Sequence, residues 1–247
     1  MLFYIGLHVL PLAKHFDRCF ISVNILKKRR SNFIVNNWIL DSGAFSELSK
    51  HGEYKYSVEE YAKDIERWRH CGNLEIAVGQ DYMCEPFMLE KTGLSVKEHQ
   101  RLTIERYDKL TSLTDFPIMP VLQGYEPQEY IEHIDMYGGR LKLNMRVGVG
   151  TLCKRNAKVT DIISVLDPIK TKCPHLKLHG LGLKTTATSN AYIASLIDSS
   201  DSMAWSFHAR INGRDANSLE EAELFKDKLE YKLGKNPTQL RFKDSHT

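Results

Sequence analysis

The sequence predicts an α/β fold of the (β/α)8 TIM-like barrel type, with allowance for irregularity at the N-terminus, in a single domain over residues 1–247. From residue 35 onward, short apolar runs alternate with segments of helical periodicity. The runs are mostly apolar rather than alternating with polar residues, which is typical of parallel strands covered on both faces. A length of 247 residues with 42% hydrophobic residues suits one such barrel. An open doubly wound sheet is the alternative, although no G-x-G-x-x-G motif follows any of the runs.

Eight of the apolar runs are candidate strands, which is the number that closes such a barrel. In chain order they are Phe3–His8, Cys19–Ile25, Asn37–Asp41, Leu74–Asp81, Ile118–Gln123, Leu141–Val149, Leu176–Leu183 and Ser202–Phe207. A short helix near residues 11–17 would separate the first two strands. The other six form a series of strand-then-helix units.

Three predicted helices begin with a capping-box pattern, S-x-x-E, which is followed by apolar residues on one face of the helix. The pairs are Ser57 with Glu60, Ser95 with Glu98, and Ser218 with Glu221; the third helix would continue to Leu233 and stop at Gly234. Weaker helical patterns cover residues 126–137, 157–167 and 189–199.

The composition narrows the class of protein without naming a function. A net charge of +3 permits nucleic-acid binding but gives no argument for it. Five widely spaced cysteines without a C-x-x-C pair favour reduced thiols in a cytoplasm and disfavour a zinc site built from a cysteine cluster. The apolar start of the chain is short, is interrupted by His8 and lacks a positive leader, so we expect neither a signal peptide nor a membrane span. We expect no metal and no cofactor.

Polar residues and glycines gather where the predicted strands end, which is where barrels of this kind carry their function. Asp41, Asp81 and Gln123 each end a strand, and Asp201 lies at the start of the last predicted strand or in the turn before it. The other residues at these ends are Gly124, Gly148, Gly150, His179, Gly180, Gly182 and Lys184. Paired carboxylates can divide nucleophilic and proton-transfer roles at a sugar carbon. An aspartate after a strand is also a common helix cap or turn residue, so the pattern alone leaves both interpretations open.

Six short segments between residues 38 and 210 carry a family resemblance. They are Asp41-Ser42-Gly43-Ala44-Phe45, Gly79-Gln80-Asp81, Val121-Leu122-Gln123-Gly124, Gly148-Val149-Gly150, Gly180-Leu181-Gly182 and the segment Asp201-Ser202-Met203-Ala204-Trp205-Ser206. Taken in this order, they resemble the tRNA-guanine transglycosylase superfamily, and most of all its compact DNA-acting branch of DpdA-type proteins. The tRNA enzymes share a Cys/His zinc site near the C-terminus, whereas no cysteine follows Cys173 here. That difference favours DNA over tRNA as the substrate.

The resemblance implies an exchange of guanine in DNA for a free 7-deazaguanine base, such as the 7-cyano form. Asp201 would be the nucleophile that forms a covalent glycosyl-enzyme, and Asp41 the general base or acid. The residues implied to bind the substrate are Ser42, Gly43, Asp81, Gln123, Gly124, Gly148, Val149, Gly150, Gly180, Gly182 and Trp205. Asp81 and Gln123 would bind the base edge, since a carboxylate accepts from adjacent N–H groups and an amide can donate to a carbonyl. Trp205 fits either stacking on a nucleotide or packing in the core.

Basic residues supply candidate contacts to DNA phosphates. These are Lys27, Lys28, Arg29, Arg30, Lys184, Arg210 and Arg214. The run Lys27–Arg30 also suits an ordinary solvated loop. The resemblance further implies a homodimer and a cytoplasmic location, which is the host cytoplasm for a phage-encoded protein. The alternatives are a tRNA-guanine transglycosylase without its zinc site, a non-catalytic nucleic-acid-binding partner subunit, and an unrelated barrel glycosidase.

Overall fold

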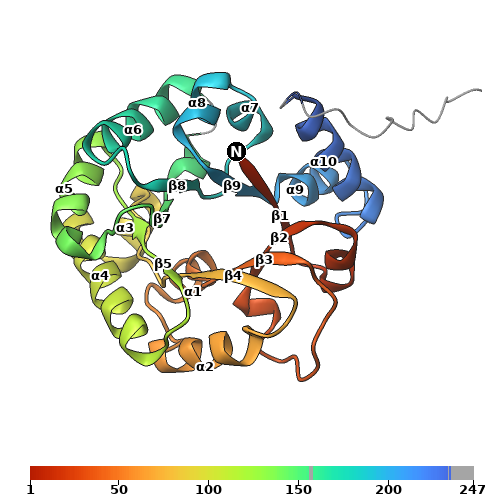
Figure 1. Ribbon diagram of the computed structural model, residues 1–247, viewed down its shortest axis with the longest axis horizontal. Helices are drawn as coiled ribbons and strands as arrows, with labels where there is room; N and C mark the ends of the chain where they lie inside the picture. Colours follow the sequence, from red (N-terminus) through yellow and green to blue (C-terminus); the bar gives the residue numbers. More distant parts are fainter. Residues whose placement is uncertain (156–157, 233, 235–247) are drawn as a thin grey trace, which may run out of the picture.

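The computed structural model describes residues 1–155, 158–232 and 234, which form a ring of parallel strands surrounded by helices (Figure 1). The strands are β1 (Leu2–Leu7), β2 (Arg18–Ser22), β3 (Asn37–Asp41), β4 (Asn73–Val78), β5 (Ile118–Met119), β6 (Val121–Leu122), β7 (Arg146–Val149), β8 (Lys177–Gly180) and β9 (Ser199–Ser202). Their order in the sheet is β5-β4-β3-β2-β1-β9-β8-β7-β6. The predicted barrel is therefore confirmed, with nine strands in place of eight. The single domain over 1–247 stays a prediction, because residues 235–247 lie outside the described part.

The ninth strand arises at Pro120, which separates β5 from β6 within one predicted strand. Proline has no backbone N–H to give to a neighbouring strand. The residues before it pair with β4 and those after it pair with β7, so this segment bridges the two ends of the sheet. Within the part of the chain that the structure describes, β5 and β6 are joined through Pro120 and not by strand pairing, which leaves one seam in the ring.

The helices follow the strands around the outside of the barrel (Figure 1). They are α1 (Ala44–His51), α2 (Val58–Trp68), α3 (Pro86–Thr92), α4 (Val96–Leu113), α5 (Pro127–Tyr137), α6 (Val159–Lys172), α7 (Thr185–Thr188), α8 (Ala191–Leu196), α9 (Ala204–Ile211) and α10 (Leu219–Lys232). Short 3-10 helices are η1 (Leu10–His15), η2 (Val23–Ile25), η3 (Gly138–Arg140) and η4 (Leu152–Lys154). The reciprocal capping boxes predicted for α2 and α4 are both present, and α10 begins directly after Ser218 as predicted. The start of the predicted helix 157–167 and the proposed end at Leu233 fall on residues outside the described part.

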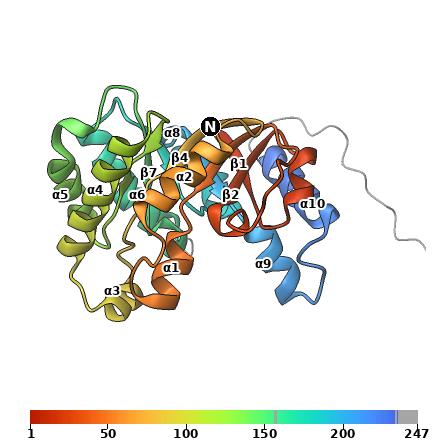
Figure 2. The same cartoon turned by 90° about the horizontal axis from the view of Figure 1, so that it is seen from below.

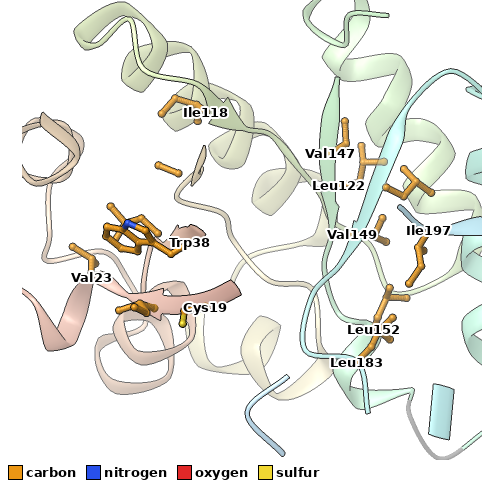
Figure 3. Close-up of a cluster of buried hydrophobic side chains, with 14 of the residues drawn as sticks. Cys19, Val23, Trp38, Ile118, Leu122, Val147, Val149, Leu152, Leu183 and Ile197 are labelled. Atoms are coloured by element: carbon orange, nitrogen blue, oxygen red, sulfur yellow. The ribbon is translucent and has the colours of Figure 1, made fainter. Parts of the chain in front are cut away.

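Two layers of apolar side chains hold the barrel together. Tyr4, Ile39, Val78, Met119 and Val121 pack inside it. A larger cluster lies between the strands and the helices, and Figure 3 shows part of it, with Trp38 on one side and Val147, Leu122 and Val149 on the other. The strands are therefore covered on both faces, which is the physical reason for their apolar runs.

Several predicted strands were too long or displaced. The strand predicted at Ser202–Phe207 is wrong, because β9 is Ser199–Ser202 and α9 starts at Ala204. Trp205 and Ala209, four residues apart, are the buried face of that helix. Leu141–Val149 shortens to β7 because Asn144 turns with a φ of 59°. Cys19–Ile25 ends its strand at Ser22, whose side chain caps η2.

Candidate functional site

The carboxyl ends of β3 and β9 bring Asp41 and Asp201 to one cavity. Asp41 is the last residue of β3 and Asp201 is the third of four residues in β9. Because all strands run parallel, their carboxyl ends meet at the same end of the barrel. Both aspartates line a cavity of about 320 Å³, together with Ser22, Asn24 and other residues. The remaining lining residues are Gly6, Leu7, His8, Phe20, Ile25, Ser46 and Met203. The predicted pairing of an early and a late aspartate across one pocket therefore has a geometric basis.

Asp201 is almost buried and is held by two hydrogen bonds on one oxygen. Its Oδ1 lies 3.2 Å from His179 Nε2 and accepts from the Gly182 N–H at 3.0 Å. Gly182 turns with a φ of 65°, a conformation that glycine adopts without strain and that aims its N–H at the carboxylate. Both contacts fall on Oδ1, so Oδ2 is the oxygen available for reaction.

His179 is fully buried beneath Asp201. Its ring stacks on Phe20 with centroids 5.8 Å apart and meets the edge of Tyr4. Its Nδ1 lies 2.8 Å from Ser199 Oγ. If the Ser199 hydroxyl donates to Nδ1, the ring proton sits on Nε2 and is donated to Asp201. The opposite tautomer would set a lone pair against the carboxylate, so the geometry favours the Nε2–H form.

Asp41 has an elevated pKa. Burial raises it from 3.8 to about 6, and the nearby charge of Asp201 adds to this, while hydrogen bonds from Ser22 and from backbone N–H groups oppose it. One of these N–H groups is that of Gly43, 3.2 Å from Asp41 Oδ2. Gly43 has a φ of 75°, and a Cβ there would come within 2.3 Å of Asn24. The Asp-Ser-Gly sequence thus lets the chain turn sharply from β3 into α1 and hold the carboxyl at the turn.

Asp81 follows β4 and is held by Gln123, which follows β6. The Gln123 amide donates to Asp81 Oδ2, and its carbonyl oxygen accepts from Thr151 Oγ1 at 3.0 Å. Burial raises the pKa of Asp81 from 3.8 to about 7; the charge of Asp41 adds to the rise and the Gln123 hydrogen bond opposes it. Asp81 is not among the residues that line the Asp41–Asp201 cavity. The charge of Asp41 raises the pKa of Asp81, and besides burial both charges raise the pKa of Tyr54, which places Asp81 next to that cavity.

Gln123 is fully buried and hydrogen-bonded throughout. Its backbone N–H donates to His133 Nδ1 at 2.8 Å, and its backbone carbonyl oxygen accepts from Gln100 Nε2 at 2.8 Å. A Cβ at Gly150 would come within 2.2 Å of its side-chain amide, so glycine is required there. Gln123 therefore positions Asp81. Contact with a base would require its amide to leave the partners that it has in the structure.

Several residues predicted to bind substrate serve packing instead. The backbone groups at Gly148, Val149 and Gly150 are engaged: Gly148 N–H with Pro120, Gly150 N–H with Leu122, and the Gly150 oxygen with Tyr130. The Val149 side chain points into the outer core, since alternate residues of a strand face opposite sides. Gly124 and Gly180 allow close approach of Tyr130 and Leu183, respectively. Ser42 is fully buried beside Asp41.

Trp205 is also a packing residue rather than a wall of the cavity. It is 2% exposed, and its indole N–H donates to the Gly6 oxygen at 2.8 Å. Its ring stacks on His8, which itself lines the cavity. Of the two interpretations open for Trp205, these contacts favour packing in the core over stacking on a nucleotide. Trp205 supports the cavity from behind.

The predicted DNA-binding cations differ in their protein contacts and in their exposure. Lys27 pairs with Glu47 at 3.0 Å and lies over the Tyr56 ring, and Arg214 pairs with Glu221. Arg29 donates to the carbonyl oxygens of Ser31 and Asn32. Lys28, Arg30, Lys184 and Arg210 are exposed. Within the run Lys27–Arg30, Lys27 and Arg29 therefore stabilise a loop through contacts within the protein. This agrees in part with the alternative interpretation of the run as an ordinary loop.

Sequence reasoning did not assign His179 and Ser199 to the site. The signal was present in the alternation along β9, where Ser199 and Asp201 are two residues apart and face the same side. It was hidden because the strand had been placed three residues too late. His179 was noted at a strand end, but its contact with Asp201 depends on the register between β8 and β9, in which His179 pairs with Ser199.

The comparison with known families decides the class of this barrel. Residues 2–225 match the family DpdA, described as DeoxyPurine in DNA protein A. The chain belongs to the DpdA family. No curated protein matches the sequence. Membership in DpdA, together with the barrel, identifies a transglycosylase-type enzyme of DNA modification, with DNA as substrate. Among the residues described for this DpdA chain, no helix has the length and apolarity to cross a membrane, and no cluster of three potential metal-binding side chains is found.

Proposed function

We propose that this protein exchanges guanine in DNA for a free 7-deazaguanine base, with Asp201 as the nucleophile and Asp41 as the proton-transfer group. One observation carries the proposal. Two aspartates share one cavity, and their surroundings differ: Asp201 is held by His179 and Gly182, whereas burial raises the pKa of Asp41 to about 6. Carboxyl groups whose surroundings differ in this way can take separate catalytic roles.

The two halves of the exchange balance. In the first, Asp201 Oδ2 attacks C1′ of the target nucleotide, the C1′–N9 bond breaks, and its electron pair leaves with guanine, which receives a proton from Asp41. In the second, Asp41 takes the N9 proton of the incoming base, N9 attacks C1′, and the Asp201–C1′ bond breaks. Asp41 ends with the proton it had at the start. The covalent step divides one difficult substitution into two easier ones.

Asp81 is the proposed reader of the base. When ionised, its carboxylate can accept from the two adjacent N–H groups of a guanine edge. A 7-deazaguanine carries the same edge, so one acceptor would serve both the departing and the arriving base. Gln123 and Thr151 fix the carboxylate through the hydrogen bonds described above. His179 is proposed as a positioning residue that holds and orients the carboxylate of Asp201.

The test uses DNA labelled in its guanine base, incubated with the protein and an unlabelled 7-deazaguanine such as the 7-cyano form. We expect release of labelled guanine and, after denaturing quenching, a protein–DNA adduct. Asp201→Ala should lose at least about 10³-fold in rate and form no adduct. A matched control is Asp115→Ala. It removes an exposed aspartate that pairs with Arg69 and contacts none of the three site aspartates, so it should leave both readouts unchanged. Normal exchange by Asp201→Ala contradicts the assignment, and labelled tRNA in place of DNA tests the RNA alternative.

A further inference from the structure

Exposed apolar side chains flank the Asp41–Asp201 cavity on two sides. The α1–α3 flank consists of Phe45 and Phe87, which are 53% and 42% exposed and whose ring centroids lie 6.4 Å apart. The α9 flank consists of Met203, Phe207 and Ile211, which are 48%, 62% and 66% exposed. Spaced four residues apart, the α9 residues lie on one face of the helix.

Both flanks lie at the carboxyl end of the barrel. Helices α1 and α9 start directly after β3 and β9, and α3 follows the loop after β4. Figure 2 shows α1 and α3 on one side and α9 on the other, all extending beyond the same end of the strands. Each flank also continues into the cavity, because Met203 and Ser46, the neighbour of Phe45, are among its lining residues.

The α9 flank forms one wall of a second hollow. Phe207, Ile211 and Leu224 line a groove of about 800 Å³ between α9 and α10. Its charged lining residues are Lys184, Arg214, Glu220, Glu221 and Lys228. Arg210 is exposed on the same helix. The charged residues of this border are three cations and two carboxylates, with Arg214 paired to Glu221. An apolar surface with lysines at its border, next to the Asp41–Asp201 cavity, is typical of a surface that binds a strand of nucleic acid.

We propose that the two flanks bind the bases on either side of the target nucleotide in an unpaired DNA strand. This inference rests on the proposed function. A nucleotide whose C1′ reaches Asp201 has left the base stack, so its neighbours have each lost a stacking partner. Aromatic and apolar side chains replace that partner for any base, since every base has a flat face. The cations beside the α9 flank contact the phosphates of the same strand.

The experiment measures binding without chemistry. A fluorescent single-stranded oligonucleotide with one guanine is titrated with the protein in the absence of any free base, and anisotropy gives the Kd. Phe45→Ala and Phe207→Ala should each raise the Kd about 5- to 50-fold. The matched control is Leu143→Ala, because Leu143 is 74% exposed in the turn before β7, at the opposite end of the barrel. It should leave the Kd unchanged. The wild-type protein should bind the corresponding duplex more weakly than the single strand.

Results of two kinds overturn the inference. In the first, both phenylalanine variants bind the single strand as tightly as Leu143→Ala does, or the wild-type protein prefers the duplex. In the second, the variants alter sedimentation of the protein alone and not DNA binding, which would make the flanks an interface between copies of this chain. A protein that binds through the flanks but releases no guanine would contradict the proposed function and leave this inference standing.

Discussion

The two ends of the barrel interior differ in whether their charged side chains are paired with opposite charges. Near the amino ends of β4 and β7, Glu75 pairs with Arg146 at 3.1 Å, and the Tyr4 hydroxyl donates to the same carboxylate at 2.7 Å. Charges there are matched. At the carboxyl end, Asp41, Asp81 and Asp201 lie close together, and no lysine or arginine of the described ranges 1–155, 158–232 and 234 forms an ion pair with any of them.

The difference shows how one barrel separates stability from chemistry. A matched pair satisfies the groups that it buries. Burial, together with the hydrogen bond to Glu75, raises the pKa of Tyr4 to about 12, while the charge of Arg146 opposes the rise. Burial makes the carboxyls at the other end costly to ionise, and their closeness adds to this cost, so the pKa values of Asp41 and Asp81 rise to about 6 and 7. Groups that titrate near neutral pH suit proton transfer. The cost in folding stability is therefore concentrated at the end where function is expected.

The strongest challenge to this comparison is Asp41→Asn. We expect the rate of guanine release to fall about 10²- to 10⁴-fold, because the amide cannot transfer a proton. We also expect the free energy of unfolding at pH 8 to rise, since a carboxylate that is costly to ionise has gone. Single-turnover release and urea unfolding measure the two quantities. Loss of both activity and stability would show that Asp41 supports the fold, and would end the contrast between the two barrel ends.

The second prediction concerns the matched end. Arg146→Met leaves Glu75 without its cation and should lower the free energy of unfolding by about 2 kcal/mol, less than for a fully buried pair because both side chains are about one fifth exposed. The rate of guanine release per folded molecule should not change. The control is the double variant with Glu75→Gln, which should recover part of the lost stability. An exchange rate that falls with Arg146→Met would mean that the two ends are coupled.

The third prediction uses pH. Asp81 has a folded-state pKa of about 7 against 3.8 for the free side chain. Since the folded state holds the proton more tightly, the stability that this group contributes is greatest below about pH 4 and is lost as the pH rises through 7. Asp81→Asn should therefore add nothing at low pH and about 2 kcal/mol at pH 8, within the limit of about 4 kcal/mol set by the pKa change.

Urea unfolding of the wild type and of Asp81→Asn at pH 5 and pH 8 checks this prediction. Asp115→Asn is the control, since that side chain is 84% exposed and its replacement should give no pH-dependent gain. The same ionisation should appear in catalysis, opposed by that of Asp41, which must begin with its proton: kcat/KM should rise as Asp81 ionises, fall as Asp41 loses its proton, and peak between about pH 6 and 7. A variant that is stabilised equally at both pH values would show that burial of the Asp81 charge carries no cost.

The sequence predicted the carboxyl end better than it predicted the contacts inside it. Asp41 was placed correctly at a strand end, whereas Asp81 lies three residues after the end of β4 at Val78 and not at the end itself. An apolar run followed by Asp-Ser-Gly or Gly-Gln-Asp marks the neighbourhood of such an end locally. Asp201 was chosen through the family resemblance, since β9 reads S-S-D-S and has no apolar run. Its buried serines face neighbouring strands and polar groups, which periodicity cannot show.

Charge partners were beyond local patterns as well. Arg214 and Glu221 are seven residues apart across a turn. Glu75 of β4 meets Arg146 of β7, which is 71 residues away in the sequence, and the β5–β6 segment separates these two strands in the ring. A sequence shows that these residues are charged but not which of them is already paired. The helix capping boxes were predicted correctly because both partners lie within four residues of one another.

The smallest expected effect concerns Ser199, which acts on Asp201 through His179. Ser199→Ala removes the hydroxyl that donates to His179 Nδ1, so the ring is no longer fixed as the Nε2–H tautomer. We expect kcat for guanine release to fall about 5-fold, a change of about 1 kcal/mol, with KM for DNA unchanged. Ser199→Thr keeps the hydroxyl and should restore kcat.

Nitrogen NMR of His179 gives a readout that a merely structural role would not move. The wild type and Ser199→Thr should show a protonated Nε2 and an unprotonated Nδ1, whereas Ser199→Ala should show a mixture of the two tautomers. If the wild-type ring is protonated on Nδ1 alone, Asp201 receives no hydrogen bond from His179. The orientation of the Asp201 carboxylate would then depend on its hydrogen bond from the Gly182 N–H. A backbone group, and not the side chains of Ser199 and His179, would position Asp201 at the carboxyl end.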